Sequence, residues 1–454
     1  HVRSRRQRQM CIRDSSIMKK NFYKGLMTLC FCSVVFTTNV MAQDESPFAG
    51  GTGTPDDPYL IATPQQFDRM RDARGASYKL IADLDFSNVH FDYEGGWWPI
   101  GEWGSGSGSA DRFHGTFDGD GHTIKNFYVE KPTGAHDMTF FGVVEGATIE
   151  RVIFENITFI GEGRMGMISG QTEKTTIREV GAINCTVKNI GTGVEAGGFV
   201  GPGSQVVIYD CYFVDGSIVC DGKLSETDLR GDNAAALVGK AENMTAIMSS
   251  YVSGTVVARN NLGGIAGMID ASSSISGCLA MCDVTGNDDA TGIGRICGGG
   301  SPDLSSGNYA LETAKVNGNL VTTDNNADQR NGADVTKADL TQEFYEELGF
   351  DFDNVWKMDP SISDYPVFKW QKAGSTGVKN IDNDTNYIVS ATTDGVKVEG
   401  LKGNETICIY DVTGMLLNEQ IATQGSMTIS LNATGICIVN IVSSDATSTF
   451  KVAK

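Results

Sequence analysis

The sequence predicts an all-β protein: a right-handed parallel β-helix with short capping helices, followed by a small C-terminal β-sandwich. Two observations lead to this prediction. The glycine-rich middle of the chain repeats itself with periods of 28 to 38 residues, and no helical stripe separates its short apolar runs. Residues 387–454 instead hold four alternating apolar runs split by turn residues, which is typical of antiparallel strands.

The first 42 residues are expected to be absent from the mature chain. We interpret residues 1–17 as a start-site artefact, because they are basic, carry no pattern and precede a better initiator methionine. Residues 18–42 have the order of a signal peptide: lysines, an apolar run, then small residues. Cleavage is predicted between Ala42 and Gln43. The apolar run of about eleven residues is too short to span a bilayer, so no transmembrane anchor is expected in the mature chain.

The charge of the chain excludes some partners. Loss of residues 1–42 removes eight Lys or Arg and one Asp, and so changes the net charge from −20 to −27. Such a chain repels phosphate backbones and anionic membranes, so nucleic acid is not an expected partner. The cysteines form no C-x-x-C pair, and no H-E-x-x-H string occurs. No metal site and no cofactor are therefore predicted.

The repeat itself consists of five short glycine-containing segments of one shape. They are residues 166–170, 197–201, 235–239, 263–267 and 294–298, and Phe140–Gly142 opens the series. Seven or eight positions after the closing glycine, an isoleucine recurs: Ile149, Ile177, Ile208, Ile247 and Ile275. One such unit cannot bury its apolar face, but coiling the chain stacks the isoleucines into one core. The fixed glycines are expected to permit either positive φ or close backbone approach.

Both ends of the β-helix have candidate caps. Thr63 and the proline after it predict the start of a short helix over Gln65–Arg71, and Phe67, Met70 and Leu80 are expected to cover the first rung. At the other end a helix is predicted over Leu340–Leu348, stopped by Gly349. The apolar residues of Val355–Trp356 and Pro366–Trp370 are expected to form a lid over the last rung.

The repeat resembles a known bacterial motif. Gly198–Gly201, Ala236–Gly239 and Gly264–Gly267 look like the GLUG motif of surface proteins, although Ala236 replaces its first glycine. Segments upstream resemble the leader of such repeats: Gly50–Ile61, Ile81–Asp85, Trp98–Gly101 and Phe113–Ile124. The resemblance covers about residues 48–370. It implies a β-helix over residues 43–371, with the repeats at about 138–300.

The C-terminal module resembles a type A sorting domain of type IX secretion, from a Bacteroidota-like cell. The resemblance rests on Ile409–Gly414, Leu431–Ile436 and Lys451–Lys454, while Cys437 stands where the family usually has tyrosine. Residues 387–454 would then be the sorting domain, joined by a polar linker at 372–386. The resemblance implies contact with the type IX export machinery, removal of the module, and an extracellular or outer-surface location.

One insertion is a candidate binding loop. The longest repeat has about ten extra residues, which fall within Gly216–Asn233. Loops on a rigid scaffold often hold binding residues, although a solvated insertion without a ligand stays an open alternative. The polar residues of this candidate ligand-binding loop are Asp221, Lys223, Glu226, Asp228, Arg230 and Asp232.

Three other groups have competing interpretations. The first group is a cluster of aspartates and histidines, in which the aspartates alternate with glycine. This pattern favours turn and capping roles over a metal or acid–base site for Asp111, His114, Asp118, Asp120 and His122. Cys185, Cys211 and Cys278 are expected to fill core positions rather than to form disulfides, and Cys408 and Cys437 are a candidate pair. The tryptophans near the N-terminal cap are expected to be buried beside it rather than to form an exposed platform for sugar rings; they are Trp97, Trp98 and Trp103.

The predicted function is that of a non-enzymatic surface protein, adhesive or structural, which displays loops to extracellular glycans or matrix proteins. No catalytic residue is assigned. The alternative is a polysaccharide lyase or glycosidase. That enzyme would need two or three carboxylates and a Lys or Arg meeting on adjacent rungs of one β-helix face.

Overall fold

The computed structural model describes most of residues 46–453. It does not describe residues 1–45, 92, 94–95, 102–110, 132–136, 192–194, 221–230, 288–289, 301–306, 373–386, 393–394, 412–415, 424, 432–435, 443–446 and 454. The predicted signal peptide with its cleavage site at Ala42 and Gln43 therefore lies outside the described residues, as does nearly all of the predicted linker.

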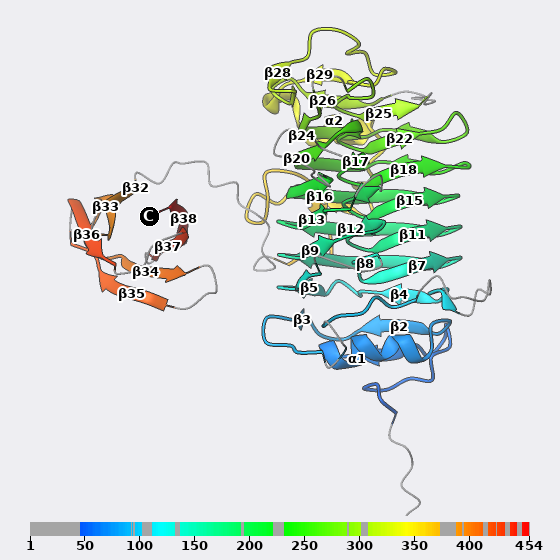
Figure 1. Cartoon of the computed structure of the whole chain (residues 1–454), viewed down its shortest axis with the longest axis horizontal. Coiled ribbons are helices and arrows are strands. Elements are labelled where there is room, and N and C mark those ends of the chain that lie inside the picture. The colour runs from blue at the N-terminus through cyan, green and yellow to red at the C-terminus, as the bar shows by residue number, and fades with distance from the viewer. Residues whose placement is uncertain are drawn as a thin grey trace, which may run out of the picture. The chain divides into compact units, whose positions relative to one another are not determined.

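The described residues between 46 and 335 form a parallel β-helix, which confirms the predicted fold class. One rung consists of β11 (Ser169–Glu173), β12 (Thr176–Ile183), β13 (Thr186–Asn189) and β14 (Ala196–Gly197). Each of these strands pairs in parallel with the strand one repeat later, so the rungs stack as a ladder (Figure 1). The backbone hydrogen bonds of one rung are thus made with its neighbours.

The other strands of the β-helix fall into the same rows. The row of β11 contains β7 (Phe141–Glu145), β15 (Val200–Ser204), β18 (Val238–Glu242), β22 (Ala266–Ile269) and β25 (Cys297–Gly300). The row of β14 contains β10 (Met165–Gly166), β17 (Asp232–Ala235) and β21 (Asn260–Gly263). The rows of β12 and β13 belong to one 19-stranded sheet. Its other strands are β1 (Tyr59–Ile61), β2 (Ser77–Leu80), β3 (Leu84–Asp85), β4 (Thr116–Asp118), β5 (Thr123–Lys125), β6 (Tyr128–Glu130), β8 (Thr148–Glu155), β9 (Thr158–Gly161), β16 (Val207–Cys220), β19 (Ala246–Met248), β20 (Tyr251–Ala258), β23 (Ser274–Ser276), β24 (Leu279–Thr285), β26 (Tyr309–Leu311), β27 (Lys315–Val316), β28 (Asn319–Leu320) and β29 (Ala333–Val335).

The predicted isoleucine stack is confirmed. The five isoleucines are register partners from rung to rung, and each is fully buried: Ile149, Ile177, Ile208, Ile247 and Ile275. Tyr78 and Phe117 continue the same column toward the N-terminus. Burying an isoleucine contributes about 1.5–3 kcal/mol, so this column is a main source of stability.

The repeat glycines are needed for close packing rather than for positive φ. A Cβ added to Gly198 would lie 1.9 Å from the backbone oxygen of Ala236 in the next rung. At Gly201 it would lie 2.5 Å from the oxygen of Gly170 in the previous rung. Neither glycine has positive φ, so close approach of neighbouring backbones is the physical reason for them.

The left-handed backbone sits instead at corner positions that carry polar side chains. Three columns of corner residues have φ between 44° and 60°: Lys174, Gln205 and Asn243; Arg151, Glu179, Asp210 and Ser249; Asn126, Asn156, Asn184 and Asp215. Asparagine tolerates this region because its amide forms local hydrogen bonds. Here the Nδ2 of Asn184 donates to Oδ1 of Asn156 over 2.6 Å, and that residue donates to Asn126 over 3.3 Å.

The N-terminal cap agrees with the prediction. Helix α1 (Pro64–Asp68) continues as the 3-10 helix η1 (Arg69–Asp72), so the cap ends one residue later than predicted. Thr63 Oγ1 accepts from the N–H of Gln66, and proline occupies the first helical position. The side chains that were expected to cover the first rung are fully buried: Phe67, Met70 and Leu80. The cap therefore closes the end of the core.

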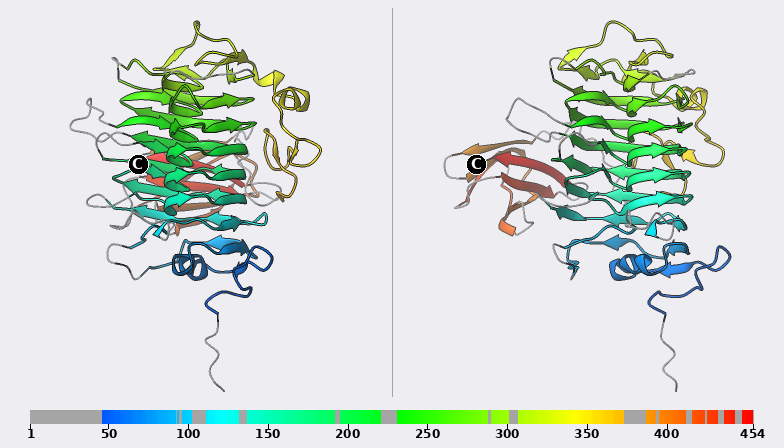
Figure 2. Two further views of the ribbon diagram at one scale, coloured as in Figure 1. Left: turned by 90° about the vertical axis from the view of Figure 1, so that its right-hand side faces the viewer. Right: turned by 45° about the vertical axis from the view of Figure 1, so that its right-hand side comes forward.

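The predicted C-terminal lid is wrong in its position. Residues 336–371, which we call the strap, do not lie across the last rung but pack along the outer face of the 19-stranded sheet, beside the rungs (Figure 2). The strap contains η3 (Lys337–Asp339), α2 (Gln342–Glu347), β30 (Trp356–Lys357) and β31 (Val367–Phe368). Helix α2 is shorter than predicted, and Gly349, with φ 90°, follows its end as expected.

The strap lies beside the rungs because the outer face of the sheet is apolar there. Tyr212 and Tyr251 stack with ring centroids 5.4 Å apart on adjacent rungs, and Phe368 stacks on Tyr212 at 5.2 Å. Trp356 packs against these rings and is fully buried. The strap thus removes the aromatic surface of Tyr212 and Tyr251 from water.

Residues 387–453 form a separate antiparallel β-sandwich, as predicted. One sheet contains β32 (Ile388–Thr392), β33 (Gly395–Leu401) and β36 (Gly425–Ser430). The other contains β34 (Thr406–Asp411), β35 (Leu416–Ile421), β37 (Ile436–Val442) and β38 (Thr447–Ala453). Their shared core includes Val396, Val398, Ile407, Ile409, Ile429, Val439 and Ile441.

Candidate functional site

Only one of the six polar residues named for the predicted ligand-binding loop is described. Asp221, Lys223, Glu226, Asp228 and Arg230 lie outside the described residues. Asp232 belongs to β17, and its Oδ1 accepts from Nε of Arg259 over 2.9 Å; Arg259 lies between β20 and β21 in the next rung. This residue thus links two rungs.

The predicted cluster of aspartates and histidines does not converge on one point. Arg151 binds Asp118 and Asp120, His122 Nδ1 lies 3.0 Å from Asp83, and Asp111 pairs with Arg74 at 3.5 Å. The Oδ1 of Asp118 also accepts from the N–H of Asp120, which has φ 47°. These are turn and inter-rung contacts. Among the described residues no group of three or more His, Cys, Asp or Glu side chains is placed to hold a metal ion.

The cysteines lie in the core. Cys185, Cys211 and Cys278 are free and fully buried, as expected. Burial raises the pKa of the Cys185 and Cys278 thiols to about 12. The candidate pair in the β-sandwich is not opposed, because Cys408 is the register partner of Asn440 and Cys437 that of Asp411.

Two of the predicted tryptophans can be placed. Trp97 is buried beside the N-terminal cap, where its Nε1 donates to the oxygen of Thr139 over 2.9 Å. Trp98 is half-buried, with the Lys131 ammonium 4.8 Å from its ring centre. Trp103 lies outside the described residues. Burial beside the cap is therefore confirmed for Trp97.

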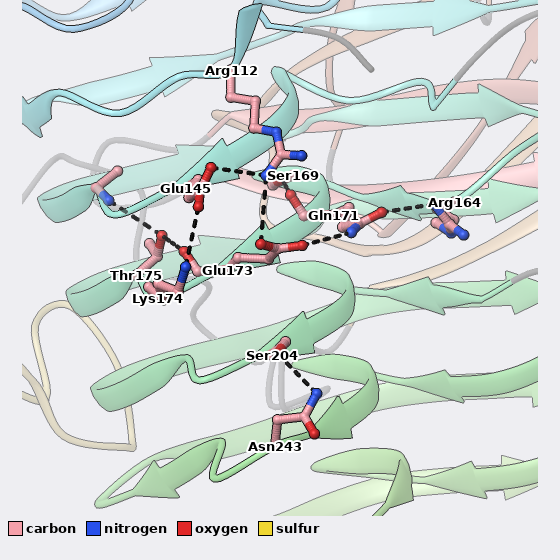
Figure 3. Close-up of polar contacts among 11 residues, drawn as sticks. Arg112, Glu145, Arg164, Ser169, Gln171, Glu173, Lys174, Thr175, Ser204 and Asn243 are labelled. Carbon is pink, nitrogen blue, oxygen red and sulfur yellow. Dashed lines mark hydrogen bonds and ion pairs between the residues drawn. The ribbon is translucent and has the colours of Figure 1, made fainter. Parts of the chain in front are cut away.

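A polar ladder crosses the row of β7 and β11, and sequence reasoning did not find it. Glu145 and Glu173 are register partners on adjacent rungs, and Arg112 Nη1 lies 2.8 Å and 3.5 Å from their carboxylates (Figure 3). Lys174 adds a contact of 3.3 Å to Glu145. The Nε2 of Gln171 donates to Glu173 over 3.2 Å. Two carboxylates and two cations on adjacent rungs form the group that the enzymatic alternative requires.

The charges of this ladder neutralise one another. Burial alone would raise the pKa of Glu145, but Lys174 and Arg112 hold the pKa below its ordinary value. A general acid needs a carboxyl group that stays protonated near neutral pH, and therefore a raised pKa. Glu145 is not suited to that task, and the arrangement links rungs through ion pairs. One sequence signal was available: a glutamate stands four residues before Ile149 and before Ile177.

A second candidate is a cavity of about 380 Å³ beside Tyr128, near the N-terminal end of the β-helix, which we call the Tyr128 hollow. Its walls come from residues 86–97 and from the segment around β6. The residues that line it are Phe86, Ser87, Val89, His90, Phe91, Gly96, Trp97, Asn126, Phe127, Tyr128, Val129 and Glu130. Tyr128 is 61 % exposed, and its hydroxyl donates to Oε2 of Glu130 over 2.6 Å. The hollow thus combines an exposed aromatic ring with polar groups.

Two indole contacts hold the strap, one buried and one partly buried. Trp356 Nε1 donates to Oδ1 of Asp210 over 2.9 Å, and Trp370 Nε1 donates to Oε2 of Glu179 over 2.8 Å. The two acceptors occupy one corner column on adjacent rungs. Burial raises the pKa of Asp210 to about 6, although the indole N–H favours the ionised form.

Comparisons with known proteins give partial matches. No family model matches the chain. A protein of Evansella cellulosilytica named as a Gly-rich membrane protein is 32% identical over 139 residues, which are 30% of this chain and 15% of that protein. A Halomucin of Haloquadratum walsbyi is 34% identical over 137 residues, 29% of this chain and 1% of that protein. The chain thus matches only a small part of these relatives.

Among solved structures, one chain named IgA1 Protease aligns with a TM-score of 0.38 and 16% identity. The alignment covers 60% of this chain and 21% of that chain. Within the described part of this protein, no helix has the length and apolar character needed to cross a membrane.

Proposed function

We propose that this chain is a secreted or cell-surface repeat protein with an adhesive or ligand-displaying role. The proposal rests chiefly on the continuous register of the rungs, which builds a rigid scaffold from one buried column. Such scaffolds present side chains at fixed spacing along one face. The names of the two relatives, a membrane protein and a Halomucin, support a location at or outside the cell surface.

A binding screen tests the ligand-displaying role. The full mature chain would be applied to arrays of host and microbial glycans and of extracellular matrix proteins. We expect saturable binding to at least one member of the array, with loss of binding after thermal unfolding. A folded chain that binds no glycan and no matrix protein would contradict an adhesive role.

Export by type IX secretion through residues 387–454 is a second part of the proposal. It rests on the resemblance of the sequence to type A sorting domains and on the β-sandwich found there. In a host with this secretion system, the full chain should reach the outer surface or the medium. A chain without residues 387–454 should accumulate in the periplasm. Equal surface labelling of both chains on intact cells would refute this route.

The enzymatic alternative has one observation in its favour, the meeting of Glu145, Glu173 and Arg112 on adjacent rungs. Their mutual ion pairs argue for a structural role instead. Incubation of the mature chain with uronic-acid polymers and calcium should therefore release no unsaturated ends. Release of such ends that the variant Glu173→Gln abolished would reverse the assignment.

A further inference from the structure

The floor of the Tyr128 hollow is a cluster of packed aromatic rings. Phe91 and Trp97 meet edge to face with ring centres 4.9 Å apart, and Trp97 meets Phe127 at 5.2 Å. Phe86 lies 4.6 Å from Phe127. The indole N–H of Trp97 is fixed on Thr139. Because this floor is packed into the core of the β-helix, a ligand would meet it with little loss of conformational entropy.

The upper part of the hollow has a different chemistry. Tyr128 lies on β6, whose side chains alternate between exposed and buried, and its ring is exposed. Glu130 is the next outward residue on the strand, and the hydroxyl of Tyr128 positions its carboxylate. Ser87 adds a hydroxyl, while the amide of Asn126 is already bound to Asp85 and Asn156. An aromatic face beside hydrogen-bond acceptors matches a flat ligand with one apolar side and several hydroxyl groups.

We infer that the Tyr128 hollow binds a neutral sugar residue of a glycan, with its C–H face on the ring of Tyr128 and its hydroxyl groups donating to Glu130. This inference deepens the proposed ligand-displaying function and rests on it, because it gives that function a site. The volume lies near the lower end of the ~300–1,000 Å³ of small-molecule sites, which suits one or two sugar rings.

The charge of the site selects against acidic sugars. Glu130 lines the hollow, and the chain carries a net charge of −20. A uronic acid or a sialic acid would place a second carboxylate beside Glu130, and two neighbouring negative charges repel each other. Neutral hexoses have hydroxyl donors and no such penalty.

The test uses the full mature chain and defined probes. Neutral trisaccharides of glucose, galactose and mannose, each in α- and β-linked form, would be titrated by calorimetry, with trigalacturonate as the acidic counterpart. We expect one neutral probe to bind and trigalacturonate to bind at least tenfold more weakly. Binding of no neutral probe, or equal binding of trigalacturonate, would overturn the inference.

Variants locate the binding. Tyr128→Ala should weaken binding of the neutral probe about tenfold, which is the loss expected for one aromatic contact. Tyr128→Phe keeps the ring and should lose less. Leu320→Ala removes another exposed apolar side chain, 59 % exposed on β28, and should change nothing. Since Tyr128 is exposed, its replacement should leave the circular dichroism spectrum and the thermal midpoint unchanged.

The outcomes separate this inference from the broader function. If a neutral probe binds equally well to the wild type and to Tyr128→Ala, the site is elsewhere and the ligand-displaying function stands. If the array screen finds only protein ligands, the broader function stands and the sugar site is refuted. If neither screen finds a ligand, both proposals fail.

Discussion

The two faces of the long sheet are covered in different ways. The inner face is closed by repetition, because each isoleucine of the column meets its equivalent one rung away. The outer face under the strap is covered by residues that are distant in sequence from the rungs. An example is Trp356, whose indole donates a hydrogen bond to Asp210. The contacts along the isoleucine column are all apolar, whereas the strap also contains hydrogen bonds between indole groups and carboxylates. Repetition therefore builds the scaffold, and one unique segment finishes it.

The largest expected effect on stability comes from a substitution in the isoleucine column of the inner face. Ile208→Ala should lower the free energy of unfolding by about 3–4 kcal/mol, because the cavity lies inside a fully packed column. Urea unfolding monitored by circular dichroism measures it. Val207→Ala, next in the same strand but only partly buried, is the matched control and should cost far less. Equal effects of the two variants would show that the isoleucine column is not the main support.

A somewhat smaller effect is expected from breaking the strap. Trp356→Ala removes the largest buried side chain of this contact and its hydrogen bond to Asp210. The strap should open locally while the rungs stay folded, because no rung strand runs through it. Hydrogen exchange in residues 336–371 should accelerate about 100-fold, which corresponds to about 3 kcal/mol. Equal acceleration across the rungs would mean that strap and rungs unfold together.

The pH dependence of the strap sharpens the comparison. The pKa of Asp210 is about 6 in the folded chain, above its ordinary value of 3.8, so the folded state binds its proton more tightly. The free energy of unfolding should therefore fall as pH rises from about 4 to about 6, and stay lower above that. Asp210→Asn keeps an acceptor for Trp356 without the buried charge.

The variant Asp210→Asn should match the wild type near pH 4 and be more stable by about 2 kcal/mol at pH 7.5. Denaturation at the two pH values measures the difference. Asp210→Ala is the control, because it removes the acceptor and should be less stable than Asp210→Asn at both. A constant difference between wild type and Asp210→Asn across this range would contradict the buried charge.

The smallest effect concerns a corner of the repeated part. Asn156 has φ 53° and links the amides of Asn126 and Asn184. Asn156→Ala should cost about 1 kcal/mol, since alanine is disfavoured in this backbone region. Asn156→Gly also loses the hydrogen bonds, but glycine adopts positive φ without the backbone cost. The difference between the thermal midpoints of the two variants therefore measures the backbone cost, and the remaining loss in Asn156→Gly measures the hydrogen bonds. A more stable alanine variant would contradict the role of the left-handed corner.

Much of the fold could be predicted because the same pattern of glycines and isoleucines occurs in each repeat of the sequence. The isoleucine spacing sets the register, and the glycine segments mark where neighbouring backbones meet. The corner columns were missed because Lys174, Glu179 and Asn184 look like ordinary surface residues in one sequence. Their shared conformation follows only from their position on the coil.

The strap could not be placed because its contacts join residues 146 and 191 positions apart. A partial signal was present, since Val152, Ile153 and Phe154 are consecutive buried residues of one strand. Such a run indicates a strand covered on both faces. It does not say which segment covers it. The Tyr128 hollow could not be predicted for a similar reason, because its walls, residues 86–97 and the segment around β6, meet only in the folded coil.

The free thiols of the rungs give this protein a set of internal reporters. Buried examples in the described β-helix are Cys185, Cys211, Cys278, Cys282 and Cys297. A thiol reagent can reach such a group only while its rung is open. The relative alkylation rates of these cysteines, read by mass spectrometry, would thus show where along the coil breathing begins, without any added label.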